Sequence, residues 1–186
     1  AFTPLCDAKI SVMDRGFIFG DGIYEVVPVY NGRPFRFAQH MARLERSLVE
    51  MRMANPHTRE QWLGIAMGLI GHGAKAEGVA PDTLNQLVYI QVTRGVAMRD
   101  HVMPTDIEPT VFAMANVMRP PTQEQLENGV ACVTADDFRW EKAHIKSTSL
   151  LGAVFARQIS FDADAIETVM FRGDHLSEAA ASNVWV

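Results

Sequence analysis

Two apolar runs joined by Asn31-Gly32 limit the architecture of this chain more strongly than any other stretch. Residues 23–37 read IYEVVPVYNGRPFRF, and Asn-Gly between alternating apolar positions is the strongest short-range signal for a β-hairpin. Pro28 lies inside the first run, where it cannot donate a ladder hydrogen bond, so it predicts an edge position or a bulge. The N-terminal half is therefore expected to contain an antiparallel sheet.

The segment before the hairpin is rich in glycine. Residues 14–22 read DRGFIFGDG and place Gly16, Gly20 and Gly22 among aromatic side chains. Glycine suits a tight loop whose backbone closely approaches another group. We expect such a loop here.

Hydrophobic periodicity predicts the other elements of the N-terminal half. One amphipathic helix is expected over residues 40–51 and a second over 60–70, with strands over 83–95 and 110–118. The second helix should turn inward Trp62, Leu63, Ala66, Met67 and Ile70. Gly71 and Gly73 should end it, because glycine commonly follows the last helical turn.

Two prolines at 120 and 121 predict an interdomain linker over residues 119–123. The chain is accordingly divided into an N-terminal α/β domain, 1–118, and part of a second domain, 124–186. The second domain should contain a strand over 130–138, a helix that begins just after Lys146, and strands over 168–173 and 181–186. Because the last residues, SNVWV, have the pattern of an unpartnered strand, we expect that domain to be truncated in this sequence.

The composition excludes several classes of protein. A net charge of -5 without a Lys/Arg-rich run argues against a nucleic-acid partner. No apolar stretch is long enough to cross a membrane, and no export signal is evident. Cys6 and Cys132 are far apart and are interpreted as reduced thiols of a cytoplasmic protein. The six histidines show no metal-ligand spacing, so no metal is expected.

Lys146 is a candidate nucleophile. It precedes Ser147, Thr148 and Ser149 and then an amphipathic helical run. One face of that run, which we expect to point toward a core, carries Leu150, Leu151, Val154, Phe155 and Ile159. The positive end of a helix dipole at this place would disfavour the charged ammonium form. A lysine in that setting can form a Schiff base, and the nearby N–H groups and hydroxyls suit a phosphate. The alternative is a solvated lysine near a helix cap.

Two further groups of residues could bind a ligand. Glu178 precedes small residues, AAASN, beside which a flat ligand could approach the backbone, and its carboxylate could hold a pyridine nitrogen protonated. Arg99 and His101 lie two residues apart in the loop after the strand over 83–95, an arrangement suited to binding a carboxylate. The alternatives are a solvated hairpin glutamate and a charged surface loop.

Four segments together resemble one family. DRGFIFGDGIYEVVPVYNG, VTRGVAMRDHVMP, IKSTSLLGAVFARQ and SEAAASNV occur in the order and approximate spacing of the class IV pyridoxal-phosphate aminotransferases. The resemblance spans nearly the whole chain and is strongest to the D-amino acid transaminases. It implies an α/β enzyme of fold type IV, with an α+β N-terminal domain and a barrel-like α/β C-terminal domain.

The resemblance also implies roles for individual residues. Lys146 would hold pyridoxal 5'-phosphate as a Schiff base and then move the substrate proton, Glu178 would contact the pyridine nitrogen, and Arg43 would bind the phosphate. The carboxylate of the substrate would be bound by Tyr24, Arg99 and His101, the last two often at the neighbouring subunit's site, which implies a homodimer. Less defined positions near the site are His40, Tyr89, Ser182 and Asn183.

The implied reaction is ping-pong transfer of an amino group from a D-amino acid such as D-alanine to a 2-oxo acid such as 2-oxoglutarate. An (R)-selective amine transaminase, a branched-chain aminotransferase and an aminodeoxychorismate lyase share the fold. Arg99 and His101 argue against the amine enzyme, and branched-chain aminotransferases usually lack this Arg-x-His. Residues 179–181 are alanines where close relatives have a glycine and serines, so an inactive cofactor-binding relative is the non-enzyme alternative.

Overall fold

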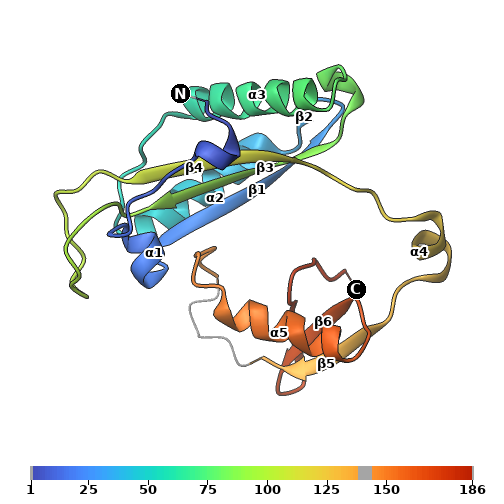
Figure 1. Cartoon of the computed structure of the whole chain (residues 1–186). Helices are drawn as coiled ribbons and strands as arrows, with labels where there is room; N and C mark the ends of the chain where they lie inside the picture. The colour runs from blue at the N-terminus through green and yellow to red at the C-terminus, as the bar shows by residue number, and fades with distance from the viewer. Residues whose placement is uncertain (1, 138–143, 186) are drawn as a thin grey trace. The chain divides into compact units, whose positions relative to one another are not determined.

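The computed structural model describes residues 2–137 and 144–185, and the chain forms two compact units (Figure 1). The first comprises Ala1–Arg119 with Ile145–Thr148, and the second comprises Pro120–His144 with Ser149–Val186. The segment Ile145–Thr148 thus belongs to the first unit, although its neighbours on both sides belong to the second. The interdomain linker expected over residues 119–123 stays a prediction.

The first unit is built on a four-stranded antiparallel sheet. Its strands are β1 (Gly22–Tyr30), β2 (Arg33–Pro34), β3 (Gln86–Thr93) and β4 (Thr110–Val117), in the order β2-β1-β3-β4.

The predicted hairpin is confirmed at the β1–β2 connection. Tyr30 pairs with Arg33, and both turn residues have positive φ, 49° at Asn31 and 72° at Gly32, as a two-residue primed turn requires. The carbonyl of Pro28 accepts a hydrogen bond from the N–H of Phe35 on the β2 side. In an antiparallel strand the nitrogen of Pro28 points to that same side. Because β2 is only two residues long, the N–H that Pro28 lacks would not have continued a long ladder of hydrogen bonds between β1 and β2.

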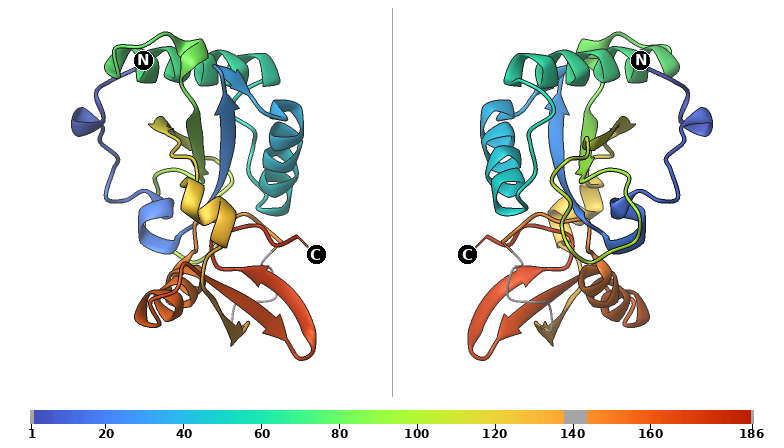
Figure 2. Two further views of the ribbon diagram at one scale, coloured as in Figure 1. Left: turned by 90° about the vertical axis from the view of Figure 1, so that its right-hand side faces the viewer. Right: turned by 90° about the vertical axis from the view of Figure 1, so that its left-hand side faces the viewer.

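Two helices cover one face of this sheet: α2 (Phe37–Glu50) packs against β1, and α3 (Arg59–Ala76) packs against β3 and β4 (Figures 1 and 2). Side chains alternate along β1, so every second residue faces the helices. The core consists of Ile23, Val27, Val29, Met41, Leu44, Leu48, Met53, Trp62, Ala66, Ile70, Val88, Ile90 and Val92. The predicted inward positions of α2 are thereby confirmed at Met41, Leu44 and Leu48.

α3 differs from its prediction in length and in its inward face. It continues through Gly71 and Gly73 to Ala76, and Leu63 and Met67 are exposed. The buried side chain of Gln86 explains Gly73, because a Cβ at this position would overlap Oε1 of Gln86. Nε2 of Gln86 also donates to the carbonyl of Ile70 at 3.1 Å. This glycine therefore permits close approach of a strand residue instead of ending the helix.

Short helices flank the sheet: η1 (Leu5–Asp7), α1 (Arg15–Phe19) and η2 (Pro81–Thr83). The glycine-rich loop expected over residues 14–22 thus contains a helix, α1, which the Asp14 side chain caps by accepting from the N–H of Gly16 at 2.8 Å. The expected close approach of backbone is present: Cβ atoms at Gly16 and Gly22 would crowd Thr93 and the carbonyl oxygen of Val92, respectively.

The second unit is a smaller α/β arrangement. After α4 (Gln123–Asn128) come β5 (Cys132–Asp136), α5 (Leu151–Asp162), β6 (Glu167–Arg172) and β7 (His175–Ala179). β5 and β6 are parallel and joined through α5, and β7 pairs antiparallel with β6. The predicted strands over 130–138 and 168–173 are present as β5 and β6, although residue 138 lies outside the described residues.

Two predictions for the second unit were wrong. The strand expected over residues 181–186 is absent from the described residues 181–185, and β7 forms earlier, directly after the turn at Gly173. In α5 the residues that face inward are Ala156 and Ser160, whereas Leu151, Val154 and Phe155 are exposed on this chain. Small side chains permit α5 to lie close to its sheet. Within the described part of the chain, no helix is both long and apolar enough to cross a membrane.

Candidate active site

Lys146 lies in an extended segment attached to β1, not at a helix start. Its carbonyl accepts a hydrogen bond from the N–H of Tyr24 at 2.9 Å, and the N–H of Thr148 donates to the carbonyl of Gly22 at 2.9 Å. Ser147 forms an isolated bridge with Ile23. α5 begins only at Leu151, and a helix dipole acts mainly within the first turn. The helix-dipole argument for Lys146 was therefore wrong, and β1 positions the residue instead.

The amine of Lys146 lies over an aromatic ring. Its Nζ is 4.2 Å from the ring centroid of Tyr24, which stacks on Tyr89 with 5.6 Å between centroids. Both tyrosines point away from α2 and α3, because they alternate with the buried residues of β1 and β3. Burial, and then the neighbouring Tyr24, raise the pKa of Tyr89, whose hydroxyl donates to Oε1 of Gln91 at 2.7 Å.

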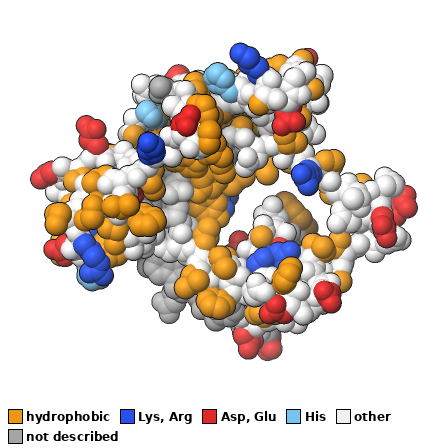
Figure 3. Space-filling model, viewed as in Figure 1, with side chains coloured by type: hydrophobic (Ala, Val, Ile, Leu, Met, Phe, Trp, Pro, Cys, Tyr) orange, Lys and Arg blue, Asp and Glu red, His pale blue; other side chains and the backbone are white. Residues whose placement is uncertain are grey.

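The open face that carries these tyrosines is largely apolar. Figure 3 shows apolar side chains gathered over the strands of the first unit's sheet. Tyr24 and Tyr89 are half-buried there. The structure thus brings together three of the predicted site residues, Lys146, Tyr24 and Tyr89, on a surface that can accept a flat, partly apolar molecule.

Arg43 and His40 of α2 meet around Glu25, whose side chain points to the helix-covered face of the sheet. The hydrogen bond to Glu25, and to a smaller extent the proximity of Tyr24, raise the pKa of Arg43, so its guanidinium lies within electrostatic range of Tyr24 on the open face. Nε of Arg43 donates to Oε1 of Glu25 at 2.5 Å and its Nη2 donates to Oε2 at 2.7 Å. Nδ1 of His40 lies 2.8 Å from Oε2. Burial raises the pKa of Glu25, but hydrogen bonds from Arg43 and His40 outweigh it and lower the pKa on balance. Arg43 is 44% exposed and Glu25 is fully buried.

Sequence reasoning missed Glu25, although a signal was present. Glu25 occupies the same alternating positions as Ile23, Val27 and Val29, which form the core-facing side of β1. A glutamate on such a face needs a partner, since a buried charge is costly unless it is paired. Nη1 of Arg43 is left without a hydrogen bond to the described residues, so it is the donor with which Arg43 can bind an anion.

Arg99 and His101 both lie against Phe19 of α1. Cζ of Arg99 is 5.5 Å from the ring centroid of Phe19, and the rings of His101 and Phe19 are 5.4 Å apart. Both side chains therefore contact the same ring, and their role as a carboxylate-binding pair stays a prediction. Both side chains are exposed, as a group that binds a small carboxylate must be.

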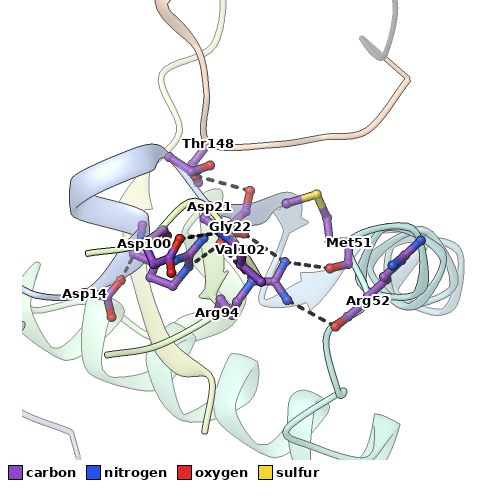
Figure 4. A network of polar contacts seen from close by, with 12 residues as sticks. Asp14, Asp21, Gly22, Met51, Arg52, Arg94, Asp100, Val102 and Thr148 are labelled. Atoms are coloured by element: carbon purple, nitrogen blue, oxygen red, sulfur yellow. Dashed lines mark hydrogen bonds and ion pairs between the residues drawn. The ribbon is translucent and has the colours of Figure 1, made fainter. Parts of the chain in front are cut away.

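Arg15 joins the segment that contains Arg99 to a buried ion cluster that sequence reasoning also missed, because its Nη1 donates to the carbonyl oxygen of Asp100. Asp21 accepts hydrogen bonds from Arg15 and Arg94, and Arg94 also donates to the carbonyls of Met51 and Arg52 (Figure 4). Burial raises the pKa of Asp21, but the bonds from Arg94 and Arg15 outweigh it and lower the pKa on balance.

The remaining predicted residues belong to the second unit. Glu178 lies in β7 opposite Met170 of β6 and is exposed, as is Asn183. The hydroxyl of Ser182 donates to Oε2 of Glu167 at 2.7 Å. Glu167 was not identified from the sequence, where it directly precedes the strand predicted over residues 168–173.

Glu167 organises the turn that follows Glu178. Its carboxylate accepts hydrogen bonds from the N–H groups of Thr168, Ala180 and Ala181 in addition to Ser182. Burial raises the pKa of Glu167, but these bonds outweigh it and the pKa is lowered on balance. Because Ala180 and Ala181 contribute through their backbone N–H groups, these bonds do not depend on the side chains at the two positions.

Comparisons with known proteins show the family and the fold of this chain. The family model described as Amino-transferase class IV matches residues 22–186. A D-alanine aminotransferase of Staphylococcus aureus (strain MSSA476) is 37% identical over 185 residues, which are 99% of this chain and 62% of the relative. This chain therefore spans about three fifths of the length of the curated relatives it matches.

Solved structures share the fold at lower identity. A fold IV transaminase of Curtobacterium pusillum matches with a TM-score of 0.78 at 18% identity, over 96% of this chain and 60% of that one. A 4-amino-4-deoxychorismate lyase of Pseudomonas aeruginosa matches with a TM-score of 0.68 at 24% identity, over 95% of this chain and 62% of that one. The resemblance predicted from four sequence segments is confirmed.

Proposed function

Because the chain belongs to the class IV aminotransferases, we propose that the protein transfers an amino group between a D-amino acid, such as D-alanine, and a 2-oxo acid, such as 2-oxoglutarate, with pyridoxal 5'-phosphate. The observation that carries the proposal is the amine of Lys146, fastened to β1 and lying 4.2 Å from the ring of Tyr24. The 37% identity to a D-alanine aminotransferase supports the choice of substrate.

The residues present fit this cofactor. Lys146 offers an amine beside a half-buried, apolar surface, and Arg43 offers Nη1 while its Nε and one N–H of its Nη2 donate to Glu25. Lys146 would hold the aldehyde carbon, Arg43 the phosphate and Glu178 the pyridine nitrogen. When bound, the cofactor supplies an electron sink for the α carbon of the substrate.

Lys146 is the group that moves a proton. A neutral Nζ can accept the proton of the substrate's α carbon and return it elsewhere, which is general acid–base catalysis by one side chain. The carbonyl of Lys146 accepts a hydrogen bond from β1, and the N–H of Thr148 donates one to β1. These two bonds hold the backbone at and just after Lys146. The ring of Tyr24 limits where the amine can lie. These contacts restrict the amine to one region without removing its freedom to react.

Glu25 fixes the direction of Arg43. Two parallel bonds between a guanidinium and a carboxylate define the plane of both groups. The fully buried Glu25 thus presents Nη1 of Arg43 in one orientation, and His40 completes the set of donors to the carboxylate.

Arg99 and His101 are proposed to bind the substrate carboxylate together with Tyr24. Their common position on Phe19 keeps two donors close to each other. Following the family, we propose that this loop serves the site of a second copy of the chain in a homodimer. We also propose a cytoplasmic location; Cys6 and Cys132 are free thiols.

The test is a visible absorption spectrum of the complete protein loaded with pyridoxal phosphate, recorded before and after D-alanine, L-alanine and an (R)-amine. We expect the spectrum of lysine-bound cofactor, and its conversion to the pyridoxamine form by D-alanine alone. Borohydride reduction and peptide mapping should place the cofactor on Lys146. Lys146→Ala should lose the attached cofactor, whereas Lys75→Ala, which changes an exposed lysine on α3, should keep it.

Other results would favour other members of the fold. Conversion by L-alanine or by the amine would overturn the D-amino acid assignment. Release of pyruvate from aminodeoxychorismate without an amino acceptor would indicate a lyase. Cofactor attachment without turnover of any substrate would indicate an inactive relative, and the absence of attachment would overturn the enzyme assignment.

A further inference from the structure

Arg15 connects the loop of Arg99 and His101 to the interior of the first unit. Its buried guanidinium donates from Nε to Oδ2 of Asp21 at 2.7 Å and from Nη1 to the carbonyl oxygen of Asp100 at 2.5 Å. Asp100 is the residue between Arg99 and His101. One side chain thus joins a buried carboxylate to the backbone at the centre of the proposed carboxylate-binding segment.

The interior end of this connection is firmly held. Nε of Arg94 donates to Oδ2 of Asp21 at 2.8 Å and its Nη2 to Oδ1 at 3.1 Å. Arg94 also donates to the carbonyls of Met51 at 2.7 Å and Arg52 at 3.2 Å, which lie at the end of α2 (Figure 4). Asp21 is therefore fixed between the end of β3 and the end of α2, and it can hold Arg15 in one place.

Phe19 supplies the second connection. Its ring centroid lies 4.8 Å from Cζ of Arg15, 5.5 Å from Cζ of Arg99 and 5.4 Å from the ring of His101. The face of an aromatic ring attracts a guanidinium, and its edges and faces accept other rings. Both proposed carboxylate-binding side chains, Arg99 and His101, thus lie on the ring of Phe19. Phe19 and Arg15 belong to the same short helix, α1.

The loop itself contains little that would order it. Residues 97–109 form neither helix nor strand, and residues 99–101 are exposed. Across the described residues 2–137 and 144–185, the hydrogen bond and ring contacts that join residues 99–101 to the rest of the unit come from Arg15 and Phe19. Without them, Arg99 and His101 would sample many positions.

We propose that Arg15 and Phe19 are positioning residues that set the geometry of the substrate-carboxylate site by fastening Asp100 and by supporting Arg99 and His101. The proposal rests on the proposed function of that loop. It assigns the DRGFIF segment a part in substrate selection in addition to its part in the fold. Neither residue need touch the substrate, because each acts through the loop.

The test compares Arg15→Lys and Phe19→Leu with Arg59→Lys in the complete protein. Lysine can keep the charge pair with Asp21, but it has no fork with which to reach Asp100 as well. Arg59 is an exposed arginine on α3, so it is a matched control. Each variant is assayed with D-alanine and with D-alaninamide, which lacks the free carboxylate. Hydrogen exchange is measured on the loop without substrate.

We expect the preference for D-alanine over D-alaninamide to fall about 10- to 100-fold in both variants, mainly through KM, since a small misplacement of binding groups has effects of this size. Exchange should rise in residues 97–109 and stay unchanged in α2 and β3. A merely structural role would lower activity toward both substrates alike. If Arg15→Lys fails to fold, Phe19→Leu carries the test, since Phe19 is only half-buried.

Unchanged loop exchange and unchanged preference in a folded variant would overturn the proposal. Arg99→Lys separates this failure from failure of the proposed function. If Arg99→Lys lowers the preference and the positioning variants do not, the positioning role alone is overturned. If Arg99→Lys has no effect on the preference, the carboxylate-binding role of the loop is overturned, and with it the proposal.

Discussion

Asp21→Asn should destabilise the first unit by about 3–5 kcal/mol, because it removes the charge that two buried arginines share. The side chains of Arg15 and Arg94 are each 4% exposed, and that of Asp21 is 8% exposed. Asparagine has nearly the same shape, but its amide presents a donor to groups that are already donors. Two cationic groups would then remain buried without a counter-charge.

Two matched substitutions calibrate this magnitude. Glu25→Gln also removes a buried carboxylate, but its partner Arg43 is 44% exposed and can be hydrated, so the expected cost is smaller, about 1.5–3 kcal/mol. Glu45→Gln breaks an ion pair whose side chains are 60% and 55% exposed, and it should cost less than about 1 kcal/mol. The predicted order of destabilisation is thus Asp21, Glu25, Glu45.

Urea unfolding measures this order. Trp62 is fully buried in the core of the first unit, so its fluorescence reports on that unit. Replacement of Trp140 and Trp185 by phenylalanine leaves Trp62 as the single tryptophan of this sequence. A cost for Asp21→Asn that equals the cost for Glu45→Gln would refute the assignment of Asp21 as the buried centre of the cluster.

Acid should reduce the difference in the free energy of unfolding between the unchanged protein and the Asp21→Asn variant. The pKa of Asp21 is lowered on folding, so its contribution is fully present above about pH 4, the unfolded value, and is lost as the pH falls through the folded pKa; a difference that grows in acid would contradict this sign. Gly73→Ala should destabilise α3 because its Cβ would overlap the buried Gln86, whereas Gly64→Ala in the same helix meets nothing and should stabilise it by about 0.5–1 kcal/mol; equal shifts in the Trp62 unfolding midpoint would contradict the packing argument. Thr58→Ala removes the capping box of α3 and should cost about 1 kcal/mol in the same assay; no loss would show that the cap is dispensable.

Local signals determined much of the first unit. Asn31-Gly32 specified the β1–β2 turn because few residues adopt positive φ at two successive positions. The spacing of Met41, Leu44 and Leu48 predicted the buried face of α2 correctly, because there the apolar positions follow the helical period and all pack against the sheet. Four segments in order identified the family. Each of these conclusions depends on residues that are close together in the sequence or on recognition of a pattern.

Tertiary structure decided the features that depend on distant partners. The extended position of Lys146 comes from hydrogen bonds to β1, more than a hundred residues earlier, and these override the apparent helix start. The passage of α3 through Gly73 depends on Gln86 of β3. Asp21 binds Arg94 across 73 positions of sequence. Sequence spacing by itself determined the β1–β2 turn, the buried face of α2 and the chemical groups that are available. Which buried charge meets which partner depends on long-range packing, because burial and pairing are set only when the strands and helices come together.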